Sequence, residues 1–135
     1  MTILAPNAII SVGDDQIDNH HKELFFLTST LDQACKDQKR SQLISIIEFL
    51  ETYVMEHFSE EETLMKKMNY PHHQHHQDEH EVLRNQVNKI RTQYTQKTPF
   101  NELALSIRQL SDQIITHIYT IDSQMAPYIE EYHEQ

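Results

Sequence analysis

The apolar residues of this chain recur every three or four positions along four separate segments, and this spacing constrains the fold most strongly. Residues three and four apart share one face of an α-helix, so each segment is predicted to be a helix that buries one stripe. The predicted helices cover about residues 17–35, 41–68, 74–94 and 99–121. Turn-forming residues are scarce, with one glycine and four prolines in 135 residues. An all-β fold, which needs frequent turns, is therefore close to excluded.

Short connections between these segments set the predicted topology. Linkers of roughly 3–6 residues leave consecutive helices side by side and antiparallel. The sequence therefore predicts an all-α fold, an up-down-up-down antiparallel four-helix bundle with an extended N-terminal arm. We expect one domain over residues 1–135, with the arm at about 1–16, the bundle at about 17–122 and a short polar C-terminal tail. Ser41 and Thr98 are the expected N-caps of the second and fourth helices, with Pro99 at the first helical position.

The charge balance excludes several classes of partner. The chain has 11 lysines and arginines against 21 aspartates and glutamates, a formal net charge of −10. Nucleic acid and anionic membrane surfaces are thus poor partners. No apolar run approaches the ~20 residues that a bilayer requires, and the single cysteine, Cys35, cannot form an internal disulfide. We expect a cytoplasmic protein without a membrane anchor.

Histidine is unusually abundant, at ten of 135 residues, and half of these lie on the stripes that face the core. Burying so many polar groups without partners would cost several kcal/mol each, against a total stability of about 5–15 kcal/mol. A bound metal accounts for them better than a set of structural hydrogen bonds. The residues concerned are His21, His57, Glu61, His76, His80 and His117, with Asp122 at the flank of the fourth stripe. Outside the stripes, we expect His20, His72, His73, His75, His133, Glu60 and Glu62 to be in solvent.

The spacing of these seven residues favours two metal ions over one. His57 with Glu61, and His76 with His80, are four residues apart, so each pair can reach one centre. A zinc ion takes four ligands, and a single iron held by two histidines and one carboxylate would leave four donors unused. Two ions bridged by the two carboxylates use all seven donors and leave one position for a small ligand.

The residues around these donors resemble the hemerythrins, specifically the bacterial single-domain members. The matching segments span about residues 12–128 and are Ile17-Asp18-Asn19-His20-His21-Lys22, His57-Phe58-Ser59-Glu60-Glu61-Glu62 with Leu64-Met65, Tyr70-Pro71, and His117-Ile118-Tyr119-Thr120-Ile121-Asp122. The resemblance implies two iron ions with a bridging oxo or hydroxo group. It assigns His76, His80 and His117 to one iron, His21 and His57 to the other, and Glu61 and Asp122 to both as bridges.

The same resemblance implies a pocket for dioxygen at the iron with two histidines. Phe58, Ile114 and Ile118 match positions that line this pocket in the family. Gln113 stands where the family often has a tryptophan, and this chain has no tryptophan. We expect Gln113 to admit water to the pocket or to hydrogen-bond the ligand.

The function expected from the residues and the resemblance is reversible binding of dioxygen for its carriage, storage or buffering. Five histidines and only two carboxylates stabilise high-valent iron weakly, which favours binding over oxygen activation, so we do not expect an enzyme. Two alternatives remain open: an enzyme that reduces peroxide or nitric oxide, and an oxygen or redox sensor. Dioxygen is the expected partner, joined in these alternatives by a reductase or a signalling protein.

Overall fold

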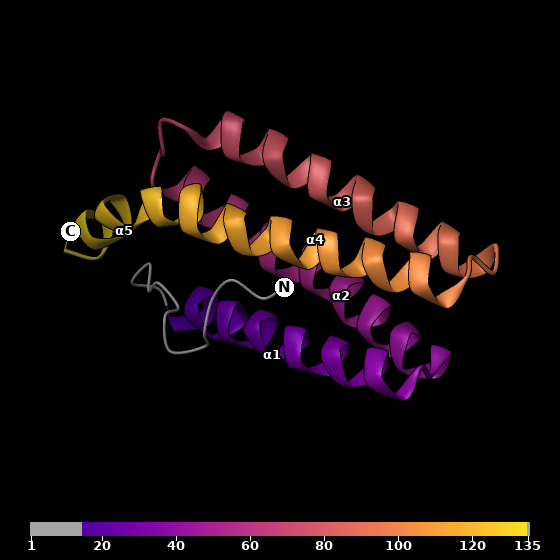
Figure 1. Ribbon diagram of the computed structural model, residues 1–135. Helices are drawn as coiled ribbons and strands as arrows, with labels where there is room; N and C mark the ends of the chain where they lie inside the picture. Colours follow the sequence, from indigo (N-terminus) through magenta and orange to yellow (C-terminus); the bar gives the residue numbers. More distant parts are fainter. Residues whose placement is uncertain (1–14, 135) are drawn as a thin grey trace.

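The fold is all-α in the part of the chain that the structure, a computed structural model, describes, residues 15–134 (Figure 1). Four long helices are followed by a single 3₁₀ turn and a short helix. Their bounds are α1 (Asp15–Asp37), α2 (Arg40–Lys67), α3 (His73–Thr95), α4 (Phe100–Thr120), η2 (Asp122–Met125) and α5 (Ala126–Glu134). The arm expected at about 1–16 lies largely outside the described residues, and α1 already begins at Asp15.

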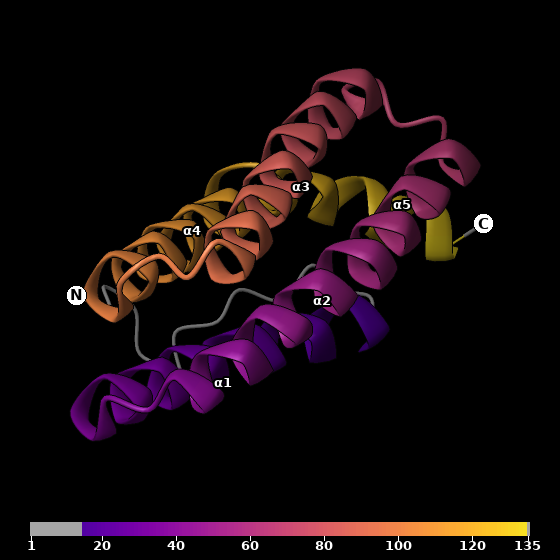
Figure 2. The ribbon, with the colours of Figure 1, turned by 90° about the vertical axis from the view of Figure 1, so that its right-hand side faces the viewer.

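The four long helices form the predicted antiparallel bundle. Helix α1 packs against α2 and α4, and α3 also packs against α2 and α4, so the four helices enclose one core (Figures 1 and 2). The connections at residues 38–39, 68–72 and 96–99 are short, which keeps consecutive helices adjacent. The up-down-up-down topology is therefore confirmed.

Each of these three connections contains one residue with a left-handed backbone. These residues are Gln38, Asn69 and Lys97, with φ values of 51°, 52° and 59°. Asparagine tolerates this conformation, whereas it costs glutamine and lysine about 1 kcal/mol each. The chain thus turns without glycine at these points.

The helix starts differ by one or two residues from the sequence prediction. Lys39 and Pro99 are the N-caps of α2 and α4, and neither makes a side-chain capping bond. Arg40 stabilises this end of the bundle instead, because its guanidinium donates to the carbonyls of Thr98 at 2.7 Å and Tyr94 at 3.1 Å. It also lies 5.0 Å from the centre of the Tyr94 ring, within range of a cation–π interaction.

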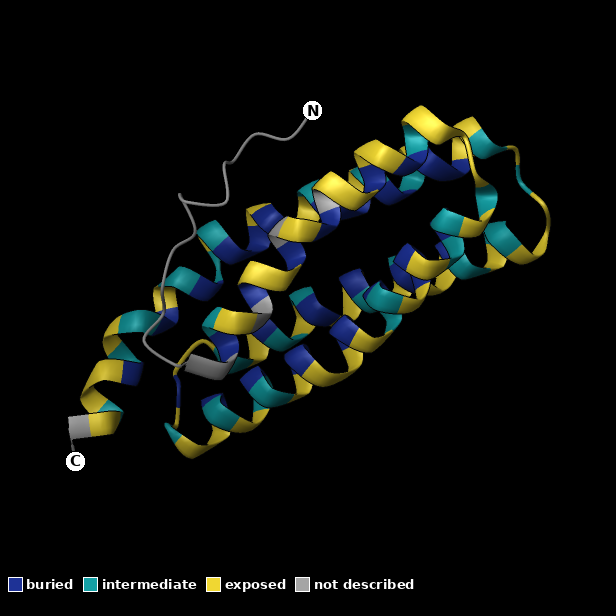
Figure 3. Ribbon diagram, turned by 90° about the horizontal axis from the view of Figure 1, so that it is seen from below, coloured by how far each residue is buried: buried dark blue, intermediate teal, exposed yellow. Residues whose placement is uncertain are grey.

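Buried residues line the inside of the bundle and exposed residues cover its outside (Figure 3). The buried apolar residues form two clusters. The larger one contains residues from all four long helices, among them Leu31, Leu43, Leu83 and Ile107. The smaller one consists of Ile17, Met65, Tyr70, Met125 and Ile129. The C-terminal segment is therefore not the simple polar tail expected: its residues form α5 and bury Ile129.

Candidate metal centre

All seven donors expected from the sequence point into the bundle, where each is at most 5 % exposed. They come from every long helix: His21 from α1, His57 and Glu61 from α2, His76 and His80 from α3, and His117 from α4, with Asp122 opening η2. The helical stripes explain six of these placements, because each of these residues continues an apolar stripe.

The seven donors form two groups that share the carboxylates. One group contains Glu61, Asp122 and the three histidines His76, His80 and His117. The other contains the same two carboxylates with His21 and His57. Within each group, one ligand atom from every residue lies within 4.8 Å of all the others. The structure therefore brings all seven residues together around two adjacent points.

Asp122 reaches this site because the chain changes its winding after α4. In a continuous α-helix, a residue five positions after His117 would point about 140° away from it. Helix α4 ends at Thr120, and Asp122 begins the tighter turn η2. Its Oδ1 lies 3.0 Å from His117 Nε2, and its Oδ2 lies 3.1 Å from Nε2 of His21, which is 101 residues away along the chain.

Short contacts between imidazole nitrogens and carboxylate oxygens fill the centre. Glu61 Oε1 lies 3.0 Å from His80 Nε2, and Glu61 Oε2 lies 3.2 Å from His57 Nε2. Asp122 Oδ1 lies 2.8 Å from His76 Nε2. Burial alone would raise the pKa of both carboxyl groups, but the surrounding imidazoles hold the pKa of Glu61 and Asp122 below the usual range.

The same carboxylates raise the pKa of several of the neighbouring imidazoles. Burial alone would lower the pKa of His21 and His76, but the nearby carboxylates of Asp122 and Glu61 outweigh it and raise each pKa to about 9. The pKa of His80 is also raised, since burial is outweighed by the nearby carboxylates of Glu61 and Glu62. Without a metal, His21 and His76 therefore hold protons beside these carboxylates.

Most of the donor atoms nevertheless lack hydrogen bonds, which is a direct test of whether a metal fits. Unsatisfied buried atoms include Nε2 of His76, His80 and His117, both oxygens of Glu61 and Oδ1 of Asp122. Several of these atoms are about 3 Å apart, yet they form no hydrogen bond with one another. Lone pairs that converge in this way require a cation between them. Imidazole and carboxylate ligands suit iron and other first-row transition metals, so the residues fit a two-metal centre.

Glu62, which the sequence predicts to be in solvent, contacts one of the donor histidines. Glu62 is half-buried, and its Oε2 accepts a hydrogen bond of 2.7 Å from His80 Nδ1. No periodic pattern predicts this contact, because Glu62 lies off the stripe of α2 and meets His80 only where two helices pack together. Among the other residues expected in solvent, His72, His75 and His133 are exposed, and His73 and Glu60 are half-buried. The side chain of His20 lies outside the described part of the structure.

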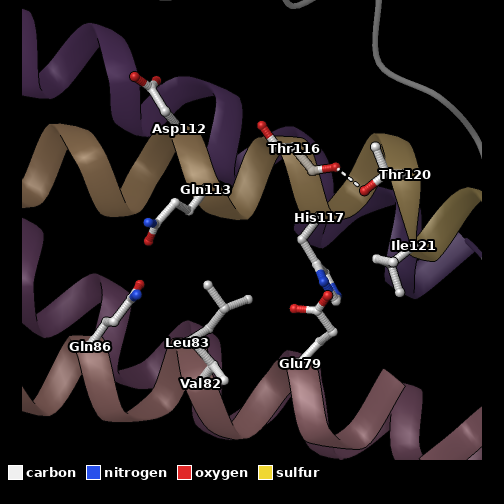
Figure 4. A pocket seen from close by; sticks show the side chains of 10 residues that line it. All are labelled: Glu79, Val82, Leu83, Gln86, Asp112, Gln113, Thr116, His117, Thr120 and Ile121. Atoms are coloured by element: carbon white, nitrogen blue, oxygen red, sulfur yellow. Dashed lines mark hydrogen bonds between the residues drawn. The ribbon is translucent and has the colours of Figure 1, made fainter. Parts of the chain in front are cut away.

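The residues expected to line a ligand pocket fall into two sets. Phe58, Ile114 and Ile118 are buried in the larger apolar cluster, and the Phe58 ring stacks on the ring of the donor His80 at 3.9 Å. Gln113 is exposed and lines a separate pocket of about 360 Å³ between α3 and α4. In this pocket Gln113 faces Gln86, and the ring of His117 lies farther along (Figure 4). This pocket therefore borders one donor residue, His117, which is itself buried.

No helix among residues 15–134 is long and apolar enough to cross a membrane. This finding agrees with the amphipathic stripes, each of which buries only one face of its helix.

Comparison with known proteins gives a consistent result over most of the chain. The family model described as the hemerythrin HHE cation binding domain matches residues 12–129. A protein named bacteriohemerythrin from Campylobacter jejuni is 28 % identical over 126 residues, which cover 91 % of this chain and 92 % of that protein. Bacteriohemerythrin from Pseudomonas paraeruginosa is 29 % identical over 85 residues, 63 % of this chain.

The matched lengths differ between these relatives. The match covers only 56 % of the Pseudomonas protein, so the chain spans little more than half the length of that relative. Bacteriohemerythrin from Stenotrophomonas maltophilia is 29 % identical over 94 residues, which cover 70 % of this chain and 61 % of that protein. No solved structure matches the chain significantly.

Proposed function

The chain belongs to the hemerythrin family, and from this premise we propose that its buried donors hold two iron ions and bind dioxygen reversibly. The observation that carries the proposal is the pair of donor groups that share Glu61 and Asp122. Seven buried donor residues are more than one metal ion can use, and several of their ligand atoms, such as both oxygens of Glu61 and Nε2 of His76, make no hydrogen bond. Relatives named bacteriohemerythrin support iron and dioxygen as the occupants.

The two groups differ in their number of histidines, which suggests different roles. His76, His80 and His117 would hold one ion, and His21 and His57 the other. Glu61 and Asp122 would be common to both. The position with two histidines has one protein ligand fewer, so it is the position we assign to an external ligand. When bound, the two irons would supply electrons that are transferred to dioxygen and returned to the irons on its release.

The chain's own residues exclude water from this region. Phe58, Ile114 and Ile118 are each no more than 1 % exposed, and all three belong to the larger apolar cluster. An apolar wall lengthens the life of a bound oxygen species, because it keeps protons and competing water away. Gln113 is exposed and lines the separate pocket between α3 and α4, so it contributes nothing to this wall.

Charge also favours this occupancy. Two divalent ions bring four positive charges into the core, and Glu61 and Asp122, both ionised, oppose two of them. A bridging hydroxide would leave a single excess charge, which a buried centre tolerates far better than an isolated high charge. A histidine must be neutral to act as a ligand, so metal binding releases the protons that His21 and His76 carry in the metal-free protein.

The test is a cycle of reduction and oxygenation with iron measured throughout. The iron-loaded protein is reduced without oxygen, exposed to oxygen and then purged, while the visible spectrum is recorded. Two irons per chain and a charge-transfer band that appears with oxygen and disappears on purging support the proposal. Immediate and irreversible oxidation would refute reversible binding. His76→Ala should lose iron, whereas the neighbouring and exposed His75→Ala should keep it.

One observation favours a second function, the reduction of peroxide or nitric oxide. The pocket between α3 and α4 is lined in part by His117, and water admitted there would make the centre release its oxidised product more readily. Steady-state turnover of either substrate with a chemical reductant would support this function. Its absence, together with a stable oxygenated form, would favour the carrier.

A further inference from the structure

Glu62 and Arg84 form a bridge between α2 and α3 on the outer edge of the metal centre. Glu62 Oε2 accepts two hydrogen bonds, one of 2.7 Å from His80 Nδ1 and one of 2.9 Å from Arg84 Nη2. Both partners are on α3, while Glu62 is on α2. One carboxylate oxygen therefore holds the far nitrogen of a donor histidine and is itself held by a guanidinium.

The Phe58 ring covers one face of the His80 imidazole. The Phe58 ring is nearly parallel to the His80 ring, with an angle of 2° and a centroid distance of 3.9 Å. The Arg84 guanidinium lies 5.6 Å from the centre of the same Phe58 ring. His80 is thus restrained along its edge by Glu62 and across its face by Phe58, and Arg84 contacts both of these residues.

His80 is distinguished by this restraint from other donors in the described part of the chain. Nδ1 of His21, His76 and His117 is buried and has no hydrogen-bond partner there. A histidine that binds a metal through one nitrogen is oriented by the bond that its other nitrogen makes. Glu62 supplies that bond to His80 alone among these four histidines.

We propose that Glu62 is a positioning residue that fixes His80 with Nδ1–H outward and Nε2 toward the metal, and that Arg84 acts through Glu62. This inference rests on the proposed two-metal centre and deepens it, because it predicts that the position with three histidines is assembled around a pre-oriented His80. The ionised carboxylate also makes the imidazole a stronger electron donor. Arg84 keeps Glu62 in place and moderates its charge.

The experiment is a titration of the metal-free protein with Co²⁺ against a competing chelator, followed by the absorbance of bound Co²⁺. Loss of an outer partner of a metal-bound histidine typically costs about 10–100-fold in metal affinity. We expect Glu62→Ala to lose this much at one of its two positions and Glu62→Gln, which keeps an oxygen acceptor, to lose less. The matched control is Glu81→Gln: Glu81 also accepts a hydrogen bond from Arg84, at 2.7 Å, but it is exposed and does not contact His80 in any described bond.

A double variant tests whether Arg84 acts through Glu62. Arg84→Met should weaken Co²⁺ binding, and Glu62→Ala with Arg84→Met should bind Co²⁺ as Glu62→Ala does alone. Additive losses would refute the action through Glu62. Helical circular dichroism of every variant identifies any that fails to fold, and the conservative Glu62→Gln then stands in for it.

A second readout reports the orientation of His80 directly. In the Zn²⁺-loaded protein, which is diamagnetic, ¹⁵N-resolved NMR should show a protonated Nδ1 on His80 with a downfield, slowly exchanging proton. That proton should move upfield and exchange faster in Glu62→Ala but not in Glu81→Gln. A wild-type protein that binds no Co²⁺ would refute the proposed function. Two bound Co²⁺ with unchanged affinity and His80 signals in Glu62→Ala would refute the present inference alone.

Discussion

Removal of the metal should make the stability of this protein strongly dependent on pH. In the metal-free centre, His21 and His76 share protons with Asp122 and Glu61, and the pKa of each histidine is raised from 6.5 to about 9. A histidine with a raised pKa in the folded state stabilises that state fully below its unfolded pKa. This contribution is lost as the pH rises through the folded pKa. The metal-free protein should therefore become less stable between pH 6.5 and pH 9.

The magnitude follows from the two pKa values. A pKa difference of about 2.5 corresponds to roughly 3 kcal/mol for each histidine. Between pH 7 and pH 9, the two histidines together should lose about 4 kcal/mol of unfolding free energy. This is a large part of the roughly 5–15 kcal/mol typical of a domain. The carboxylates do not alter this window, because a lowered carboxyl pKa acts only as the pH falls into the acid range.

The assay is urea unfolding of the chelator-treated protein at pH 7 and pH 9, followed by far-UV circular dichroism. A fall in the midpoint at constant slope gives the free-energy difference. Asp122→Asn is the matched variant, because it removes a hydrogen-bond partner of both histidines, and its midpoint should vary much less with pH. The metal-loaded protein should show the opposite trend, since its ligands must be neutral. A metal-free midpoint that stays constant or rises from pH 7 to pH 9 would refute the reasoning.

Three further predictions concern single substitutions. Glu61→Ala should lose both metal ions, because Glu61 belongs to both donor groups. Metal analysis should show near-full occupancy in the control Glu56→Ala, since Glu56 is exposed. Two metal ions retained in Glu61→Ala would contradict the shared role of Glu61. Ile118→Ala should keep its iron and lose about 2–5 kcal/mol of unfolding free energy, because the substitution leaves a cavity. Stopped-flow spectroscopy should find a shorter-lived oxygenated form. An unchanged lifetime would show that Ile118 does not protect the bound ligand. Lys97→Gly should raise the unfolding free energy by up to about 1 kcal/mol, because Lys97 has a left-handed backbone with a φ of 59°. A lower urea midpoint in this variant would argue against backbone strain at this turn.

The bundle and most of the centre could be predicted because both depend on helical periodicity. Each of His21, His57, His76 and His117 continues an apolar stripe, so its direction follows from its place in its own helix. The same reasoning left Asp122 at the flank of its stripe. Its inward direction depends on the change from α4 to η2, which no periodic pattern records.

Contacts between helices could not be predicted in the same way. Glu62 was expected in solvent because it lies off the stripe of α2, yet it bonds His80 on the neighbouring helix. The expected caps at Ser41 and Thr98 were wrong, because the tertiary contacts of Arg40 stabilise that end of the bundle without a capping side chain. The C-terminal helix was missed because its stripe is short and depends on Met125 and Ile129.

The unequal size of the two apolar clusters affects how the protein opens. The smaller cluster holds five buried side chains, which come from α1, α2, the turn after α2, η2 and α5. So few residues cannot keep a subdomain folded by themselves. Local opening at this end should therefore require far less free energy than global unfolding when no metal joins the donors. In the metal-free protein, backbone amides of α5 should exchange with deuterium much sooner than those near Leu43. The exchange rate of α5 therefore indicates whether the centre holds metal.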